Sequence, residues 1–382
     1  MLKVLEGHTQ PAKDVKILSD GRILSCAWNA IHIWHPNGVL LANLIGHSNW
    51  INGAKILPDG RILSYANDNT LRLWSEEGVP LVILSGHTSS IEGAKILSDG
   101  RILSCARDKT LRIWSAEGTP LATLEGHTRM INGAKILPDG RIISYSKDNT
   151  LRLWSAEGAP LSNLEEHTND IKGLEFLANG RILSYSYDDT LRLWSPEGTP
   201  IATLAGHVYL LEGAEVLPDG RILSYAGDDT LRLWSEEGAP LVTLGGHTDW
   251  IKGVNDVKIL SDGRILSYAN DNIIRLWSPE GTPLVTLEGE RHSIEGVMIL
   301  SDERILSYAR DNTLRLWNAE GKALAKIHFA IEGVKFHSID RHSFHLSSRK
   351  LLLIYDLYEG CQVTSLDEIT NFFESIIDDN SI

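Results

Sequence analysis

The sequence predicts an all-β protein in which one short antiparallel sheet is repeated along most of the chain. The segment from Gly60 to Trp74 returns almost unchanged in several later segments, and its tryptophan recurs every 40 residues from Trp34 to Trp234. Each repeat consists of short apolar runs separated by Asp-Gly and similar turns, without helical periodicity. Self-similarity at this period is typical of stacked repeat architectures.

The unit that ends at Trp114 shows how four strands arise from one repeat. An Asp-Gly pair between two apolar runs predicts a hairpin, because glycine adopts the positive φ that such turns require. Asp99-Gly100 forms one such turn, and further turn residues surround Asp108 and Gly118. The predicted strands are Ile91–Leu97, Arg101–Ala106, Leu111–Trp114 and Leu121–Leu124.

Sheets of this kind are apolar on both faces, so each needs a neighbour on either side. Stacking around a ring covers every sheet. We therefore expect a single closed β-propeller of four-stranded antiparallel blades. Nine units can be counted, with third strands that end at residues 34, 74, 114, 154, 194, 234, 277, 317 and 355. Nine blades are favoured, and eight blades plus an accessory unit are the alternative.

The two ends of the chain compete to complete the last blade. Leu2–His8 matches the fourth strand of another unit, Leu121–His127, so the N-terminal segment is expected to join the sheet begun by residues 329–356. Gln362–Leu366 also resembles a fourth strand. The propeller is assigned to residues 1–366. Apolar residues at helical spacing predict a C-terminal helical tail over residues 367–382.

These residues resemble a known family, the WD40-repeat proteins. A Gly-His dipeptide opens six units and a tryptophan closes the third strand, over about residues 1–366. One difference is consistent, because the aspartate that follows the tryptophan in the family is Ser or Asn here, as at Ser75, Ser115 and Asn318. The dipeptides are Gly7-His8, Gly46-His47, Gly86-His87, Gly126-His127, Gly206-His207 and Gly246-His247.

Each full unit carries a His, a Ser, an Asp and a Trp at fixed offsets. A hydrolase would need one Ser-His-Asp site, whereas this set occurs six times, so no catalytic residue is assigned. The WD40 resemblance implies a structural hydrogen-bonded tetrad instead. The tetrads are His47, Ser64, Asp68, Trp74; His87, Ser104, Asp108, Trp114; His127, Ser144, Asp148, Trp154; His167, Ser184, Asp188, Trp194; His207, Ser224, Asp228, Trp234; and His247, Ser267, Asp271, Trp277.

Positions that vary between units are free of the packing constraint that all units share. They cluster before the first strand and in the turn that precedes the tetrad Asp, and the resemblance implies that these positions form the partner-binding top face. Exposed Trp, Tyr and Arg are enriched at interface hot spots, although some of these aromatics could instead cap the ends of the sheets. The predicted partner-binding residues are Trp28, Trp50, Arg107, Met130, Lys147, Tyr187, Tyr209, Leu210, Trp250 and Arg310.

Composition limits the possible partners and location. The chain has 382 residues and a net charge of −14, which disfavours binding to nucleic acid. No apolar run approaches the roughly 20 residues that span a bilayer, and the N-terminus does not resemble a signal peptide. Cys26, Cys105 and Cys361 follow no disulfide or metal spacing. We expect a cytoplasmic monomer without cofactor or metal.

The function favoured by these features is a non-catalytic scaffold that binds a protein or peptide on the top face. The alternatives are a small-ligand or glycan binder, or an enzyme, that uses the central channel. Unit seven carries three extra residues, which the sequence places within Gly253–Val257, in the first strand or the segment that leads to it.

Overall fold

The structure is a computed structural model of the 382-residue chain. It describes residues 3–5, 7–8, 14–18, 20–248, 254–288, 293–300, 303–310, 313–328, 335–338, 343–347 and 352–356. The predicted helical tail over residues 367–382, the alternative closing strand Gln362–Leu366, Cys361 and Trp250 lie outside the described residues.

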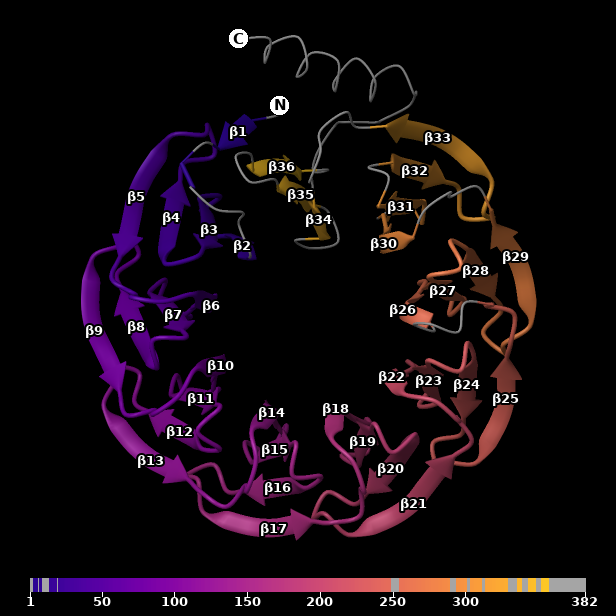
Figure 1. Cartoon of the computed structure of the whole chain (residues 1–382), viewed down its shortest axis with the longest axis horizontal. Coiled ribbons are helices and arrows are strands. Elements are labelled where there is room, and N and C mark those ends of the chain that lie inside the picture. The colour runs from indigo at the N-terminus through magenta and orange to yellow at the C-terminus, as the bar shows by residue number, and fades with distance from the viewer. Residues whose placement is uncertain are drawn as a thin grey trace. The chain divides into compact units, whose positions relative to one another are not determined.

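Eight four-stranded antiparallel sheets follow one another along the chain, and we number them blades 1 to 8 (Figure 1). Blade 1 consists of β2 (Asp14–Ile17), β3 (Ile23–Ala27), β4 (Ala30–Trp34) and β5 (Leu40–Ile45). Blade 2 consists of β6 (Ile51–Ile56), β7 (Ile62–Ala66), β8 (Thr70–Trp74) and β9 (Pro80–Ser85). Blade 3 consists of β10 (Ile91–Ile96), β11 (Ile102–Ala106), β12 (Leu111–Trp114) and β13 (Pro120–Leu124). Blade 4 consists of β14 (Ile131–Ile136), β15 (Ile142–Ser146), β16 (Leu151–Trp154) and β17 (Pro160–Leu164).

The later blades repeat this pattern. Blade 5 consists of β18 (Ile171–Phe176), β19 (Ile182–Ser186), β20 (Thr190–Trp194) and β21 (Pro200–Ala205). Blade 6 consists of β22 (Leu211–Val216), β23 (Ile222–Ala226), β24 (Leu231–Trp234) and β25 (Pro240–Leu244). Blade 7 consists of β26 (Val254–Ile259), β27 (Ile265–Ala269), β28 (Ile274–Trp277) and β29 (Pro283–Leu287). Blade 8 consists of β30 (Ile294–Ile299), β31 (Ile305–Ala309), β32 (Thr313–Trp317) and β33 (Ala323–His328).

The end of the chain departs from this pattern. The strands β34 (Lys335–Ser338), β35 (Ser343–Ser347) and β36 (Leu352–Asp356) pair antiparallel, and the outer place in their sheet is given to β1 (Lys3–Leu5) rather than to a fourth strand of the same segment. This segment also lacks the tryptophan that ends the third strand of every blade. Within the residues that the structure describes, the blade count is therefore eight, not the nine that we favoured, and closure of a ring is not detected.

The chain divides into two compact units. The larger unit comprises Leu5–Asp228 and Arg232–Leu241, and thus blades 1 to 5 and most of blade 6. The smaller unit comprises Met1–Val4, Asp229–Leu231 and Val242–Ile382, and contains blades 7 and 8.

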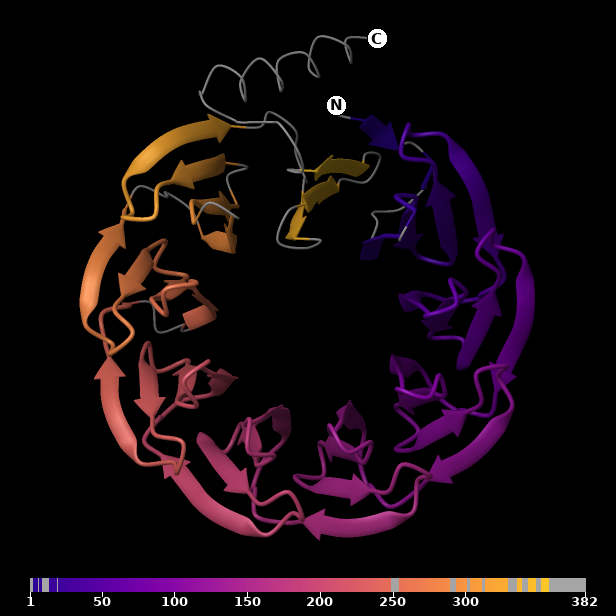
Figure 2. The same ribbon diagram turned by 180° about the vertical axis from the view of Figure 1, so that it is seen from behind.

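Within the larger unit, the apolar core lies between consecutive blades. Trp74 of blade 2, for example, is buried in one cluster with Leu24 and Ile33 of blade 1 and Ile62 of its own blade. Equivalent clusters join each later pair of blades up to blade 6. The first strands β6, β10, β14, β18 and β22 lie next to one another, and both views show this succession (Figure 1, Figure 2). The loops that precede these strands are therefore brought together at one end of the sheets.

Candidate functional site

The four tetrad side chains of blade 2 form one continuous chain of hydrogen bonds. The Trp74 indole N–H donates to Ser64 Oγ at 2.9 Å, and Ser64 and His47 Nε2 are joined at 2.8 Å. His47 Nδ1 lies 2.8 Å from Asp68 Oδ2. Because a carboxylate only accepts, Nδ1 carries the proton and Nε2 accepts from the Ser64 hydroxyl. All three links recur in blades 3 to 7 at 2.8 to 3.0 Å.

The tetrad Asp holds the turn around itself. Asp68 also accepts hydrogen bonds from the backbone N–H groups of Ser48 and Thr70 and from the Thr70 hydroxyl. Burial by itself would raise the pKa of Asp68, but the hydrogen bonds from Thr70 and His47 outweigh it and hold the pKa below its usual value. The tetrad therefore ties the loop before the first strand to the turn after the second strand.

The same geometry rules out hydrolytic use of the tetrad serine. Ser64 is 0% exposed, and its oxygen already accepts from the indole and donates to the imidazole. A nucleophile must reach its substrate, so this serine is a structural group. The corresponding serines of blades 3 to 7 are equally buried: Ser104, Ser144, Ser184, Ser224 and Ser267.

Blade 1 carries a second histidine, His32, beside its Trp-Ser-His chain and has Asn29 in place of the tetrad aspartate. His8 Nε2 and the Trp34 indole both bond to Ser25 Oγ, at 2.6 and 2.8 Å. The His8 ring stacks on His32 with centroids 3.9 Å apart. Burial and the neighbouring His32 lower the pKa of His8 to about 4. His8 is therefore neutral at physiological pH, as its contacts require.

The variable positions come together in pairs at one end of each blade. The residue after the second strand donates a backbone hydrogen bond to the residue before the first strand, as from Asn67 N to Trp50 O at 2.8 Å. We call these paired positions the loop rim. Five further pairs are linked in the same way: Arg107 with Ser90, Lys147 with Met130, Tyr187 with Asp170, Gly227 with Leu210, and Arg310 with Ser293.

Two exposed tryptophans belong to the neighbouring loops of blades 1 and 2. Trp28 is 46% exposed and Trp50 is 55% exposed. The backbone N–H of Ile51, the neighbour of Trp50, donates to Trp28 O at 2.5 Å. Trp28 also has a φ of 41°, in the left-handed region that strains residues other than glycine. For the stability of the fold alone, glycine would suit this turn better than tryptophan, because glycine adopts a positive φ without strain.

The cations of the loop rim are partly engaged within the protein. Arg107 Nε lies 2.6 Å from Glu92 Oε1, and Arg310 Nε lies 2.7 Å from Glu295 Oε1. Both arginine side chains are more than half exposed, so these pairs are weak and accessible. Lys147 approaches Asp170 at 4.0 Å, while Met130 and Tyr187 are half-buried.

The register of blade 7 shows where its first strand lies relative to the three extra residues. Val254 pairs with Ala269 just as Ile51 pairs with Ala66, so Asn255 is the counterpart of Asn52. The three extra residues therefore lie between His247 and Val254, ahead of a strand of normal length. Trp250 falls within this interval of the sequence and lies outside the described residues.

A comparison with protein families identifies the repeat. The profile described as WD40 (WD domain, G-beta repeat) matches residues 1–35, 38–75, 78–115, 118–155, 158–195, 198–235 and 238–278. The chain belongs to the WD40 repeat family. The profile accounts for seven repeats, and blade 8 adds an eighth sheet of the same design. WD40 proteins are commonly protein-interaction scaffolds and are typically non-catalytic.

Among solved structures, this WD40 chain is similar to the crystal structure of the computationally designed Ika8 protein. The TM-score is 0.60 and the sequence identity 23%, over 82% of this chain and 98% of that chain. This identity supports the fold alone. No curated protein matches the chain.

The described residues also bear on membrane and metal binding. No helix there has the length and apolar composition needed to cross a bilayer. No three His, Cys, Asp or Glu side chains of the described ranges gather in a group that could hold a metal ion.

The residue that replaces the WD40 aspartate has its own structural role. Ser75 follows Trp74, and its Oγ accepts hydrogen bonds from the backbone N–H groups of Glu77 and Val79, both at 3.2 Å. Its hydroxyl donates to the Glu77 carboxylate at 2.8 Å. The serine thus satisfies the turn between the third and fourth strands.

The sequence alone did not explain Gly227, the one glycine among the variable turn residues. A Cβ atom at this position would lie 2.7 Å from Cδ1 of Tyr209. The tyrosine ring therefore occupies the space that a side chain at 227 would fill. Val208, Tyr209 and Leu210 are all exposed and form an apolar patch beside this glycine. The sequence signal for this contact was the pairing of a glycine at 227 with a large aromatic residue at 209 in the same unit.

Proposed function

We propose that this WD40 protein is a non-catalytic scaffold that binds a protein or peptide through its loop rim. The carrying observation is the pair of exposed tryptophans Trp28 and Trp50, one of them held in a strained backbone conformation. Exposed strain of this kind is typical of functional sites. Tryptophan combines a large apolar area with a hydrogen-bond donor, which suits a hot spot.

A second group of rim residues supports the same proposal. Val208 and Tyr209 replace polar residues that blades 2 to 5 carry at the same two positions, and both side chains, like that of the following Leu210, are exposed. Arg107, in the same unit, adds a cation whose carboxylate partner can be exchanged for that of a partner protein. The rim of the larger unit thus offers exposed aromatic side chains together with an exchangeable charge.

The test compares variants of the two anchors with a matched surface variant. Partners are captured from cells with the wild-type protein and identified, and their Kd values are then measured with purified proteins. Trp28→Gly and Trp50→Ala are each expected to weaken binding about 30-fold, because truncation of a hot-spot residue costs roughly 2 kcal/mol or more. Leu161→Ala, a change of a similarly exposed apolar residue in the fourth strand of blade 4, is expected to leave Kd unchanged.

Trp28→Gly also separates binding from folding. The substitution relieves a left-handed conformation that costs non-glycine residues about 1–2 kcal/mol, which offsets the contacts that the half-exposed ring loses. We expect the free energy of unfolding in urea to stay within about 1 kcal/mol of the wild-type value while binding is lost. A variant that is strongly destabilised, or that binds as well as wild type, would show that Trp28 serves the fold.

A further inference from the structure

Blade 3 differs from most other blades at one position that faces its own first strand. In blades 2, 4, 5 and 6 a tyrosine of the second strand covers a glycine of the first strand, as Tyr65 covers Gly53. A Cβ atom on Gly53 would lie 2.4 Å from the Tyr65 hydroxyl, so the ring needs the glycine. In blade 3 the glycine is kept as Gly93, but the tyrosine is replaced by Cys105.

The smaller side chain leaves a pocket in the larger unit. Its volume is about 190 Å³, and it is bounded by the first two strands of blades 2, 3 and 4. That volume corresponds to roughly six waters at about 30 Å³ each, which is too little for a drug-sized ligand. Burial raises the pKa of the Cys105 thiol to about 12, so this group lines the pocket as an uncharged, unreactive wall.

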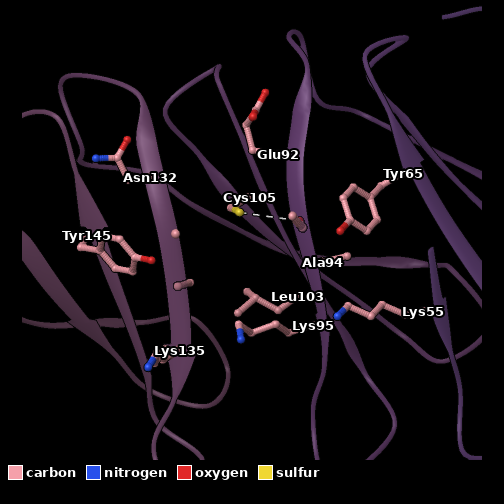
Figure 3. Close-up of a pocket in the computed structure, with 13 residues that line it drawn as sticks. Lys55, Tyr65, Glu92, Ala94, Lys95, Leu103, Cys105, Asn132, Lys135 and Tyr145 are labelled. Carbon is pink, nitrogen blue, oxygen red and sulfur yellow. Dashed lines mark hydrogen bonds between the residues drawn. The ribbon is translucent and has the colours of Figure 1, made fainter. Parts of the chain in front are cut away.

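Three lysines stand at one end of this pocket. Figure 3 shows Lys55, Lys95 and Lys135 on that side, with Glu92 and Asn132 at the other. They occupy the same position in three consecutive first strands. Lys135 pairs with Glu175 at 2.7 Å, but within the part of the chain that the structure describes neither Lys55 nor Lys95 forms an ion pair. Burial and the two neighbouring ammonium groups lower the pKa of Lys95.

Two tyrosine hydroxyls add neutral donors. Tyr65 and Tyr145 line the pocket from either side, and in Figure 3 their hydroxyl groups point toward it. Burial raises the pKa of both, to about 12 for Tyr65, so both keep their protons. The one carboxylate of the lining, Glu92, is held by Arg107 and by the Ser90 hydroxyl.

We propose that this pocket binds one small oxyanion, a phosphate or carboxylate group, against Lys55 and Lys95. Unpaired ammonium groups beside neutral hydroxyl donors form a site for a compact anion. The protein as a whole is acidic, with a net charge of −14, so a local cluster of unpaired lysines is not a consequence of its average composition. The site is separate from the tryptophans of the loop rim, and its test is independent of the proposed scaffold function.

The first experiment titrates the full chain with inorganic phosphate and, in parallel, with acetate, by calorimetry in a buffer of low chloride. Saturable binding of one anion per chain is expected. Tighter binding of phosphate assigns a phosphate group, and equal or tighter binding of acetate assigns a carboxylate. Lys95→Gln should weaken binding at least about tenfold, the effect of losing one charge-assisted hydrogen bond of roughly 1.4 kcal/mol. The absence of saturable binding of either anion overturns the proposal.

The repeat itself supplies the decisive variants. Cys105→Tyr restores the tyrosine of the neighbouring blades opposite a glycine that accepts it, so it should fill the pocket, abolish binding and keep the thermal midpoint. Tyr185→Cys should open a similar space opposite Gly173 in blade 5, where Glu175 of that blade and Glu215 of blade 6 take the lysine positions. That variant should gain no second anion site. Unchanged binding in folded Cys105→Tyr, or a second site in Tyr185→Cys, would place the anion elsewhere.

Discussion

His32 changes the surroundings of the tetrad histidine in blade 1. The other blades carry an arginine at the position of His32, such as Arg72, whereas in blade 1 the two imidazole rings stack. Protonating one ring places a charge beside its neighbour in a buried site. Burial lowers the pKa of His32 as well as that of His8, and it lowers the pKa of His47 in blade 2.

Stability should therefore fall as the pH drops from about 6.5 to about 4. In this window the unfolded chain binds a proton at His8 that the folded chain, with its pKa of about 4, does not bind. The free energy of unfolding consequently decreases with falling pH. Urea midpoints measured at pH 7, 6, 5 and 4.5 should decline, and His8→Gln should flatten that decline.

His35→Gln is the control, because His35 is an exposed turn residue of the same blade. It should keep the wild-type slope. A urea midpoint that is constant between pH 7 and 4.5, or a His8→Gln variant with the full slope, would contradict the role of buried His8.

At the scale of the strand and its turn, the tetrad links elements that the backbone ladder does not connect. In blade 4, Ser144 joins the Trp154 indole to His127, and His127 in turn reaches Asp148. The third strand, the second strand and the loop before the first strand are thus held by one serine oxygen. Removing it leaves a buried donor and a buried acceptor unpaired.

Ser144→Ala is expected to lower the free energy of unfolding by roughly 2–5 kcal/mol, since each buried unpaired group costs about 1–3 kcal/mol. Ser155→Ala is the matched control in the same blade, because Ser155 bonds only within an exposed turn. It should cost about 1 kcal/mol or less. Equal losses for the two variants in urea denaturation would argue against the tetrad as the stabilising element.

Strand limits were predicted within a residue or two, and the remaining differences have a local cause. The fourth strand of blade 3 begins at Pro120 rather than Leu121. Proline lacks the N–H that a central strand would need, but this is an edge strand, where that group is not required. The following leucine is exposed in this blade and in blades 2, 4, 6, 7 and 8, which alternation in a half-covered strand explains: Leu81, Leu121, Leu161, Leu241, Leu284 and Leu324.

Over the whole molecule, stability should depend on contacts between neighbouring blades. Leu24 of blade 1 and Ile62 of blade 2 are fully buried in one cluster, whereas Leu193 of blade 5 belongs to another. A repeat protein in which each unit packs only on its neighbours behaves as a sum of nearest-neighbour terms.

A pair of double-mutant cycles tests this in the full chain. Leu24→Ala combined with Ile62→Val should show a coupling free energy of about 0.5–3 kcal/mol, because the two residues share one cluster. Leu24→Ala combined with Leu193→Ala should be additive within about 0.5 kcal/mol. Unfolding free energies from urea titrations with equal m-values provide the comparison, and equal coupling in both cycles would contradict a nearest-neighbour description.

The sequence by itself determined the architecture of a single blade and the family. The period of 40 residues, the Asp-Gly turns and the Gly-His and Trp positions are local features, and near-identical repetition fixes their meaning many times over. Repetition also removed the Ser-His-Asp set from the catalytic candidates. The blade count was wrong by one, since the segment after residue 328 resembles a unit in its apolar runs, but in the described part of the chain the fourth place of its sheet is taken by β1.

The tertiary structure decided what depends on contacts between units. Only the register shows that the extra residues of blade 7 lie ahead of its first strand, and only packing shows that Tyr209 fills the space above Gly227. In the sequence, Cys105 stands where most other units carry a tyrosine. This substitution opens a pocket beside unpaired Lys55 and Lys95 because the fold brings first strands that are 40 residues apart in the sequence side by side. A local sequence pattern does not show which distant strands become neighbours.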